Sequence, residues 1–515
     1  MQESRSKKAV RNIVFSFGTF LLNFLIGYVS RIIFLKVLDA SYLGINGLFS
    51  NIIGILSLAD LGVGTAMMYS LYAPIAKGDT AKIASLIAFF KKIYRAIALS
   101  VLAFGLVLLP FLDFFVRLEQ PIAHLRWYYV LSLLNTVISY LFVYRTTLIT
   151  ADQKNYVISK YQMAVKLVTF AAQTAVLVAT KNYLLYLAVA LFISFLGNLA
   201  QNLAAMRMYP YLKEAALPLA QPDKSKIFSD VKSLFLYRLC GIIQTNTDNI
   251  LISVMVGTIF VGYLSNYMLV ITVFGSLLGL VFQSVKASIG NLMATKENSA
   301  DKKLIFDVLE YLNFLIVAFC SVGCAVLFQD FIQVSFGSEY RLAFLSVLAI
   351  AANFYTSNIR QNIWAFRETT GIFNETKYIT MVTAILNLVL SIAAGKVWGM
   401  SGILWATVAA RMVYAWWKEP LILYKRIFDM HCWSYIALYC VHFALAAFVF
   451  AVAYFVLPFV QIERLAAQFV LRGLVYGVIS IALLLLFTFR TKEFRWCCAR
   501  FAQPILRRVK NGRGR

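Results

Sequence analysis

Apolar residues fill long stretches of this chain, and polar residues gather between those stretches at intervals. Each apolar stretch is about 20 residues long, which is the length an α-helix needs to cross a hydrocarbon layer of about 30 Å. We predict about fourteen such helices. The second and the eighth are too long for one straight span, and we expect each to be a kinked span followed by an amphipathic cytoplasmic stretch. The predicted spans are 12–35, 42–72, 94–115, 127–150, 156–180, 183–206, 234–256, 260–292, 306–328, 342–366, 378–397, 402–417, 433–456 and 467–489.

This pattern predicts an all-α integral membrane protein, and the composition agrees. Of the 515 residues, 61% are hydrophobic and only 14% are charged, and the mean hydropathy is +0.76. A soluble protein of this length would need far more polar surface. Two longer polar connections divide the spans. We predict a six-helix lobe at 1–206, a cytoplasmic connection at 207–232, a second six-helix lobe at 233–417, a connection and two further helices at 418–489, and a basic tail at 490–515.

The two predicted lobes echo each other in sequence. Tyr-Leu-Gly-Ile-Asn-Gly at 42–47 begins the second span, and Phe-Val-Gly-Tyr-Leu-Ser-Asn at 260–266 begins the eighth. Internal repeats of this kind are common in transporters, which place the substrate site where the repeats meet. We therefore expect the helices to surround a central cavity.

Basic residues set the predicted orientation. The chain has 48 lysines and arginines against 23 acidic residues, a net charge of +25, and every second connection is basic. Cytoplasmic loops carry such an excess, so an even number of spans with both termini in the cytoplasm is expected. Because the charge follows this topology, it does not indicate a nucleic-acid partner. The seven cysteines lie mostly within or beside spans and imply no disulfide framework.

The densest polar run inside a predicted span is Gln-Thr-Asn-Thr-Asp-Asn at 244–249, which includes Asn246 and Asp248. Six consecutive polar residues cover every face of a helix, so they must be buried in protein or line water. Arg238 lies about three turns earlier on the same helix. A functional site and a buried hydrogen-bond network between helices are both open interpretations.

Three further charged residues lie within spans. Lys166 is near the middle of the fifth span, where it either lines a cavity or extends its stem partway to an interface. Arg31 is near the outer end of the first span, with the same alternative. Asp60 lies beside Gly62 and Gly64, which suggests a kink that lines a cavity, although a cytoplasmic-interface position is also open.

Amides and one more arginine complete the candidates. Asn51 and Asn387 are mid-span amides that suit sugar hydroxyls, and Arg360 lies toward the cytoplasmic end of the tenth span. The intramembrane cations outnumber the carboxylates, which favours an anionic cargo. The sequence indicates no metal site.

Three stretches carry a resemblance to a known family. They are 42–79, which contains Tyr-Leu-Gly-Ile-Asn-Gly and Leu-Ala-Asp-Leu-Gly-Val-Gly; 247–267, which contains Thr-Asp-Asn-Ile-Leu-Ile-Ser; and Asn-Ile-Arg-Gln-Asn at 358–362. The chain resembles the bacterial polysaccharide-transporter (oligosaccharide flippase) family of the multidrug/oligosaccharidyl-lipid/polysaccharide exporter superfamily, over essentially its whole length.

The resemblance implies a flippase that moves an undecaprenyl-pyrophosphate-linked oligosaccharide from the cytoplasmic to the outer leaflet of the bacterial plasma membrane by alternating access. It also implies a central cationic cavity, a groove for the lipid tail beside the last two spans, and contacts with membrane lipids, a polysaccharide polymerase and glycosyltransferases. We expect no cofactor, and coupling to protons, sodium or the membrane potential is left open. The candidate substrate residues are Arg31, Asn51, Lys166, Arg238, Asn246, Arg360 and Asn387, and the candidate coupling or gating residues are Asp60 and Asp248.

Two other classes compete with this interpretation. A drug/cation antiporter of the same superfamily would place carboxylates in its cavity, and Asp60 and Asp248 fit that class. A membrane glycosyltransferase or ligase would need acid–base or metal chemistry in an outer loop. The outer connections hold only scattered candidates without paired-carboxylate spacing, and no Gly-x-x-x-x-Gly-Lys loop occurs, so we do not expect an enzyme. Those scattered residues are Asp113, Glu119, His124 and Glu339.

Overall fold

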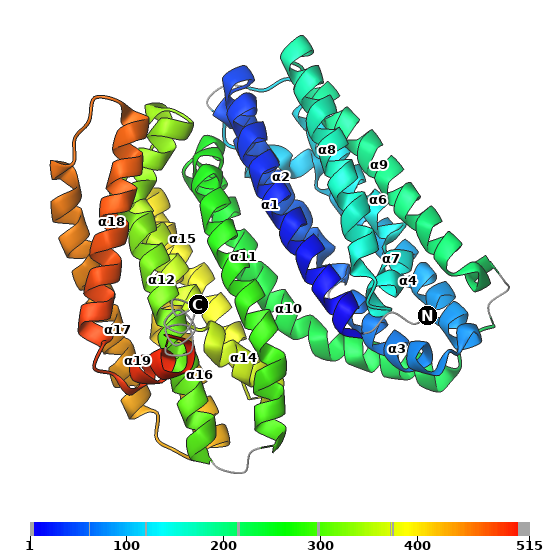
Figure 1. Ribbon diagram of the computed structural model, residues 1–515. Helices are drawn as coiled ribbons and strands as arrows, with labels where there is room; N and C mark the ends of the chain where they lie inside the picture. The colour runs from blue at the N-terminus through cyan, green and yellow to red at the C-terminus, as the bar shows by residue number, and fades with distance from the viewer. Residues whose placement is uncertain are drawn as a thin grey trace, which may run out of the picture. The chain divides into compact units, whose positions relative to one another are not determined.

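A computed structural model describes residues 5–60, 62–118, 121–213, 217–295, 299–370, 372 and 375–502. Every regular element in these ranges is a helix, which confirms the predicted all-α class (Figure 1). The longer helices are α1 (Arg5–Val37), α2 (Ala40–Leu56), α3 (Val63–Lys77), α4 (Thr80–Val107), α6 (Leu125–Tyr140), α7 (Val143–Ala151), α8 (Asn155–Thr180), α9 (Tyr183–Met208), α10 (Gln221–Met255), α11 (Thr258–Thr295), α12 (Ser299–Ser335), α13 (Phe344–Asn358), α14 (Gln361–Thr370), α15 (Lys377–Ala410), α16 (Trp416–Leu423), α17 (Trp433–Val456) and α18 (Leu465–Thr488).

Shorter helical segments join or end the long helices. These are η1 (Ser57–Asp60), η2 (Leu109–Phe111), α5 (Leu112–Phe115), η3 (Pro210–Lys213), η4 (Ser338–Tyr340), η5 (Arg411–Ala415), η6 (Tyr424–Phe428), η7 (Leu457–Phe459), α19 (Lys492–Cys497) and η8 (Cys498–Ala502).

The chain is a multi-pass membrane protein, but the expected count of fourteen spans is not confirmed. In the described residues, eight helical stretches are long and apolar enough to cross a membrane, or ten if each of two bent pairs is one span. Part of the difference comes from breaks. α2 has 17 residues and α13 has 15, and the stretch Tyr378–Phe428 counts once although the backbone leaves helical geometry at Gly399.

Two compact units divide the chain, Met1–Ser265 and Asn266–Arg515. The first unit therefore contains α10 and the first turns of α11, which the sequence analysis places in the second lobe. The predicted lobe boundaries stay a prediction, because the units are defined by packing and the lobes by the order of the spans.

The first unit packs its helices around one apolar core. In it α1 lies against α8, α8 against α9, α6 against α4 and α9, and α2 against α10. Figure 1 shows α8 and α9 side by side along their length. Large apolar side chains such as Leu48, Phe49, Phe90 and Tyr129 are buried at the centre. This burial, rather than helix propensity alone, fixes how these helices pack.

The long predicted second span is broken inside this unit, as the sequence analysis expects for a kinked helix. α2 ends in η1, and α3 begins after Gly62, whose φ of 94° is the left-handed conformation that glycine tolerates. Asp60 is the last residue of η1, so it lies at this break.

The two echoing sequence segments meet each other within the first unit. A Cβ atom added to Gly44 of α2 would overlap the carbonyl oxygen of Thr258 and lie 3.3 Å from the nitrogen of Gly262 in α11. A Cβ added to Gly262 would lie 2.5 Å from the carbonyl oxygen of Ala40. The backbones of α2 and α11 are therefore in direct contact at a glycine of each segment, and a larger residue at either position would force the two backbones apart.

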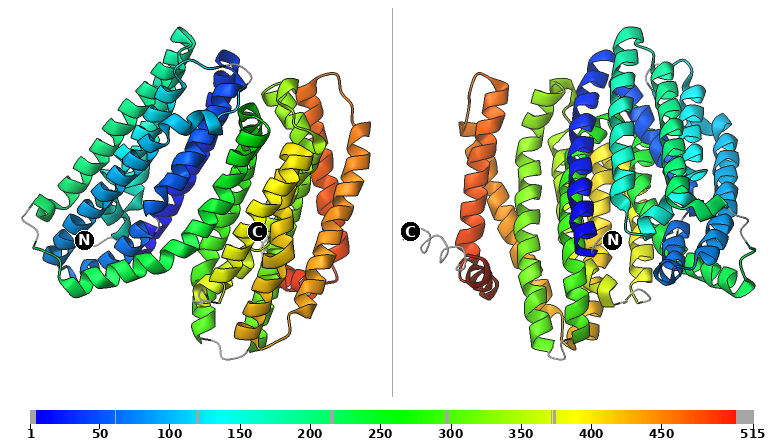
Figure 2. Two further views of the ribbon diagram at one scale, coloured as in Figure 1. Left: turned by 180° about the vertical axis from the view of Figure 1, so that it is seen from behind. Right: turned by 45° about the vertical axis from the view of Figure 1, so that its right-hand side comes forward.

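The second unit is built around α12, which packs against α13, α14, α17, α18 and α19. Figure 2 shows α17 and α18 running side by side. The core contains Phe306, Phe314, Phe366, Tyr424 and Tyr435, all almost fully buried. Polar side chains lie among these rings, and they form the charged cluster described below.

Candidate functional site

Arg31 lies against the beginning of α11. Its Nη1 donates a hydrogen bond to Oγ of Ser265 at 2.7 Å, and that hydroxyl donates to the carbonyl oxygen of Gly262, also at 2.7 Å. In this hydrogen bond the guanidinium is the donor and a neutral hydroxyl oxygen is the acceptor. Arg31 is thus fixed in position by the same turn of α11 that contacts α2.

Lys166 lies about halfway along α8, and its side chain is exposed on the first unit. Its neighbours Leu167 and Val168 are also exposed, at 46% and 55%. No ion pair is described for this ammonium group. Arg238 lies on α10, and its side chain falls outside the described residues.

The candidate amides of the first unit have local partners. Asn51 donates from Nδ2 to the carbonyl oxygen of Gly47 at 2.6 Å, one turn earlier in its own helix. Asn246 of α10 packs onto α2, since a Cβ at Gly54 would lie 3.4 Å from its Oδ1. Asp248, two residues further, is partly buried. The polar run therefore lies at least in part against protein, as a stretch that cannot face lipid must.

The second unit holds a buried charge cluster that centres on Glu419. Nη2 of Arg360 lies 2.5 Å from one carboxylate oxygen of Glu419, and Nη1 of Arg367 lies 3.4 Å from the other. The indole nitrogen of Trp364 also donates to this carboxylate, at 3.2 Å. Both arginines and Glu419 are at most 6% exposed. One carboxylate thus joins the α13–α14 connection and α14 to α16.

A second buried carboxylate lies on α12. Glu310 is fully buried and accepts a hydrogen bond from Nδ2 of Asn362 at 3.0 Å. The same Nδ2 donates to the carbonyl oxygen of Phe306 at 3.1 Å, which fixes the amide. These two clusters occupy neighbouring positions on α14 and pin it to α12 and α16.

Sequence reasoning missed Glu310, Arg367 and Glu419 as members of this core. Glu419 lies in Trp-Trp-Lys-Glu-Pro, which has the composition of a cytoplasmic connection. Arg360 and Glu419 are 59 positions apart, so their pairing has no local signal. The available signal was charge type, because two arginines seven positions apart favour an acidic partner when both are buried.

Asn387 belongs to a separate polar cluster within α15. Its Nδ2 donates to Oγ1 of Thr407 at 2.7 Å and to Oγ of Ser391 at 3.3 Å. All three are buried. Because Gly399 breaks the helix between Asn387 and Thr407, this amide ties the two halves of α15 together.

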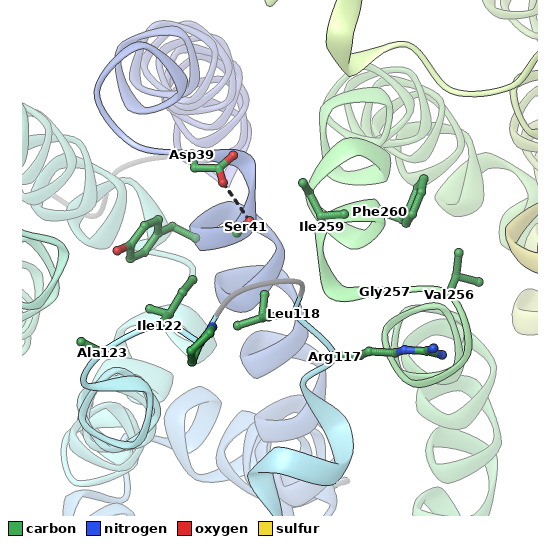
Figure 3. Close-up of a pocket in the computed structure, with 12 residues that line it drawn as sticks. Asp39, Ser41, Arg117, Leu118, Ile122, Ala123, Val256, Gly257, Ile259 and Phe260 are labelled. Carbon is green, nitrogen blue, oxygen red and sulfur yellow. Dashed lines mark hydrogen bonds between the residues drawn. The ribbon is translucent and has the colours of Figure 1, made fainter.

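Two adjoining cavities open at one end of the first unit. The larger has a volume of about 720 Å³ and lies among the connections that follow α1, α5 and α10 (Figure 3). The smaller has about 540 Å³, and the two share Leu118, Pro121 and Ile122. The sequence predicts that these connections face outward. Within the described part of the chain, no group of three or more His, Cys, Asp or Glu residues could hold a metal ion.

Neither a protein-family model nor a curated protein matches this chain. Solved structures do. The lipid II flippase MurJ in an inward closed conformation matches with a TM-score of 0.65 and 13% sequence identity, over 92% of this chain and 98% of that chain. An inward-facing multidrug resistance MATE family transporter of the MOP superfamily matches with a TM-score of 0.62 and 13% identity, over 79% and 94%. An outward-facing MATE family transporter gives 0.51 and 13%, over 82% and 95%.

These matches establish the fold. The chain has the fold that these MATE transporters and MurJ share, as the resemblance stated from the sequence implies. All three similar structures are membrane transporters or flippases by their own descriptions.

Proposed function

We propose that this protein is a flippase for a lipid-linked oligosaccharide, carried on undecaprenyl pyrophosphate, and that it works by alternating access. The observation that carries the proposal is the match to the lipid II flippase MurJ, which takes in 92% of this chain and 98% of that one. A cargo with a lipid tail and a polar head agrees with that fold.

The extent of the matches favours MurJ over a drug transporter as the functional guide. The inward-facing MATE transporter is matched over 94% of its own length, yet it leaves about a fifth of this chain unmatched. The MurJ match leaves only 8% of this chain unmatched.

The chemistry of the first unit supports an anionic head group. Arg31 is held by a hydroxyl, and Lys166 is exposed partway along α8 with no ion pair described. Arg145 of α7 likewise donates to a neutral acceptor, Oδ1 of Asn202, at 2.5 Å. Guanidinium and ammonium groups form strong hydrogen bonds to pyrophosphate oxygens.

The proposed setting is the bacterial plasma membrane, with both termini in the cytoplasm. There the protein would receive its cargo from glycosyltransferases and deliver it to a polysaccharide polymerase. The sequence resemblance alone supports these two partners.

A leaflet-resolved assay tests the proposal directly. Purified protein is reconstituted into liposomes with a defined undecaprenyl-pyrophosphate-linked oligosaccharide, and a membrane-impermeant glycosidase reports the sugar in the outer leaflet. We expect the protein to accelerate sugar exposure relative to protein-free liposomes. A rate equal to that of the protein-free liposomes contradicts the proposal.

The proposed cation site has its own test. Lys166→Ala and Arg238→Ala should each lower the flipping rate at least tenfold, which corresponds to about 1.4 kcal/mol, because each removes a charge that contacts pyrophosphate. Lys396→Ala is the matched control, since Lys396 is an exposed lysine on α15, three residues before the break at Gly399. Full activity in the double variant would reject this site.

A drug/cation antiporter is the second candidate. The match to the inward-facing MATE transporter and the acidic residues Asp60 and Asp248 favour it. Asp248→Asn separates the two functions. In a flippase it should slow turnover or change the pH, sodium or voltage dependence, whereas in an antiporter it should abolish efflux of a cationic drug from proteoliposomes. Efflux of such drugs by the wild type, without flipping, would favour the antiporter.

A further inference from the structure

The two cavities of the first unit form a groove whose size suits a ligand. Their volumes, about 720 and about 540 Å³, both lie in the range of 300–1,000 Å³ that is usual for small-molecule sites. They adjoin along Leu118, Pro121 and Ile122. The residues that the proposed flippase uses for pyrophosphate, Arg31 and Lys166, line neither cavity.

The floor of the groove is fixed by hydrogen bonds between two connections. The backbone nitrogen of Arg117 donates to Oγ1 of Thr258, and the nitrogen of Thr258 donates to the carbonyl oxygen of Arg117, both at 2.9 Å. Ser253 donates to the carbonyl oxygen of Phe115 at 2.7 Å. Ser253 and Thr258 are completely buried. The groove is therefore formed before any ligand arrives, which lowers the cost of binding.

Hydrogen-bonding groups line the rim of the groove. Asp39 occupies the residue before α2, yet its side chain does not cap that helix and instead accepts from Oγ of Ser41 at 3.0 Å. Figure 3 shows this pair facing each other, and Arg117 extending toward Val256. Nη1 of Arg117 donates to the carbonyl oxygen of Met255 at 3.2 Å, and its remaining N–H groups can donate elsewhere.

The smaller cavity, like the larger one, is lined by both a carboxylate and a guanidinium group. Asp113 and Arg126 lie 3.7 Å apart and are both well exposed, at 74% and 66%. The ring of Trp127 is 61% exposed beside them. A position at the membrane interface accounts for an exposed tryptophan alone, but it does not account for a carboxylate and a guanidinium in the same hollow.

This set of groups fits a sugar better than it fits pyrophosphate. The two carboxylates of Asp39 and Asp113 offset the charges of Arg117 and Arg126, so the groove lacks the positive excess that a pyrophosphate requires. Sugar hydroxyls both donate and accept hydrogen bonds, and therefore use carboxylates and guanidinium groups together. The less polar faces of sugar rings can pack on apolar side chains, which Trp127 and Phe260 supply.

We propose that this groove is a saccharide-binding site for uncharged sugar residues, and that it receives the sugar portion of the cargo on the outer side of the membrane. The inference rests on the proposed function for the source of the sugar, and on the predicted topology for the side. It adds a second contact point, separate from the cation site, that holds the head group after it has crossed.

Binding of soluble sugars tests the site without any transport step. Short oligosaccharides of uncharged hexoses and N-acetylhexosamines are titrated into the detergent-purified full chain, and binding is followed by saturation-transfer NMR and tryptophan fluorescence. We expect saturable binding by at least one sugar. Asp39→Asn with Asp113→Asn, and separately Trp127→Phe, should weaken it at least tenfold. Glu463→Gln, an exposed carboxylate on a connection predicted to face the same side, is the matched control.

A second measurement covers variants that fail to fold. A photo-cross-linking amino acid at Ile122 should label with the bound sugar in otherwise wild-type protein, and excess free sugar should suppress the labelling. The inference is overturned if no sugar binds saturably, or if the double asparagine variant, correctly folded, binds as the wild type does. If the wild type flips its lipid-linked cargo while the groove binds no sugar, only this inference fails. If soluble sugar binds but no flipping occurs, the proposed function fails instead.

Discussion

The two units differ in how deeply the ion pairs compared here are buried. In the first unit, the described ion pairs lie near helix ends and stay partly exposed. An example is Lys154 with Asp152, at 30% and 22%. Arg145 of α7 donates to a neutral amide oxygen, Oδ1 of Asn202. In the second unit, Arg360 and Arg367 share Glu419 in a core where none of the three side chains is more than 6% exposed.

This difference in acceptors distinguishes charged side chains that stabilise the fold from charged side chains that we propose bind the cargo. A carboxylate partner offsets the charge of a buried arginine, and removal of that carboxylate takes this compensation away inside the core. A neutral amide or hydroxyl acceptor does not cancel the positive charge of the arginine that donates to it. The second unit therefore uses its buried charges to hold α14 and α16 together, whereas Arg145 in the first unit donates to a neutral acceptor.

The largest effect should follow loss of the shared carboxylate. Glu419→Gln removes the carboxylate that pairs with buried Arg360 and also contacts Arg367, and we expect a loss of about 3–5 kcal/mol in the free energy of unfolding. Such a loss would appear as a lower thermal midpoint in detergent and a smaller monodisperse peak on size-exclusion chromatography. Glu463→Gln, which changes an exposed carboxylate, is the control and should leave both unchanged.

A companion variant makes this prediction sharper. Replacing Arg360, Arg367 and Glu419 together by apolar residues of similar volume removes the charges as a set, and it should recover most of the lost stability. If the single Glu419→Gln variant is as stable as the wild type, the cluster does not hold this core and the contrast between the units is wrong.

The sequence could predict this contrast only in part. Hydrophobic periodicity was enough for the helical class, because lipid forces every spanning segment to satisfy its own backbone. It also located Asn387 within an apolar spanning stretch. It could not find Glu419, since the distance from Arg360 along the chain hides a pairing made only by tertiary packing. It also could not count the spans, because breaks such as the one at Gly399 carry no periodic signal.

The contact between α2 and α11 should give the next largest effect. Gly44→Ala places a methyl group against the backbone of Thr258 and Gly262, which cannot move as a side-chain tip can. We expect a loss of about 1–3 kcal/mol, the usual cost of overpacking. Gly27→Ala is the control on the neighbouring helix, because a Cβ there meets nothing within 4 Å. Thermal midpoints of the two purified variants make the comparison.

The similarity of the two segments in sequence predicts a repeat, but it does not predict this contact. The pattern at 42–47 and 260–266 gave no reason to expect the two copies to touch. The structure supplies that reason, since each glycine removes the side chain that would separate the two backbones. Equal midpoints for Gly44→Ala and Gly27→Ala would mean that the helices separate easily at this point.

The smallest effect concerns a polar contact near the helix ends of the first unit, where Tyr209 follows α9. Its hydroxyl donates to Oδ2 of Asp152 at 2.8 Å, and Lys154 lies over its ring at 5.4 Å. Burial, and after it the hydrogen bond and charge of Asp152, raise the pKa of Tyr209 above its ordinary value. The hydroxyl therefore stays protonated and keeps donating at neutral pH.

Tyr209→Phe removes this donor and leaves a partly exposed carboxylate that water can still solvate, so we expect a loss of only about 1 kcal/mol. Because the pKa in the folded protein lies above that of the unfolded chain, the stabilisation is fully present below a pH of about 10 and is lost only as the pH rises through the folded-state pKa. The difference in thermal midpoint between wild type and variant should thus stay constant from neutral pH up to about pH 9. A loss as large as that of Glu419→Gln would show that the first unit, like the second, depends on its charged contacts for stability.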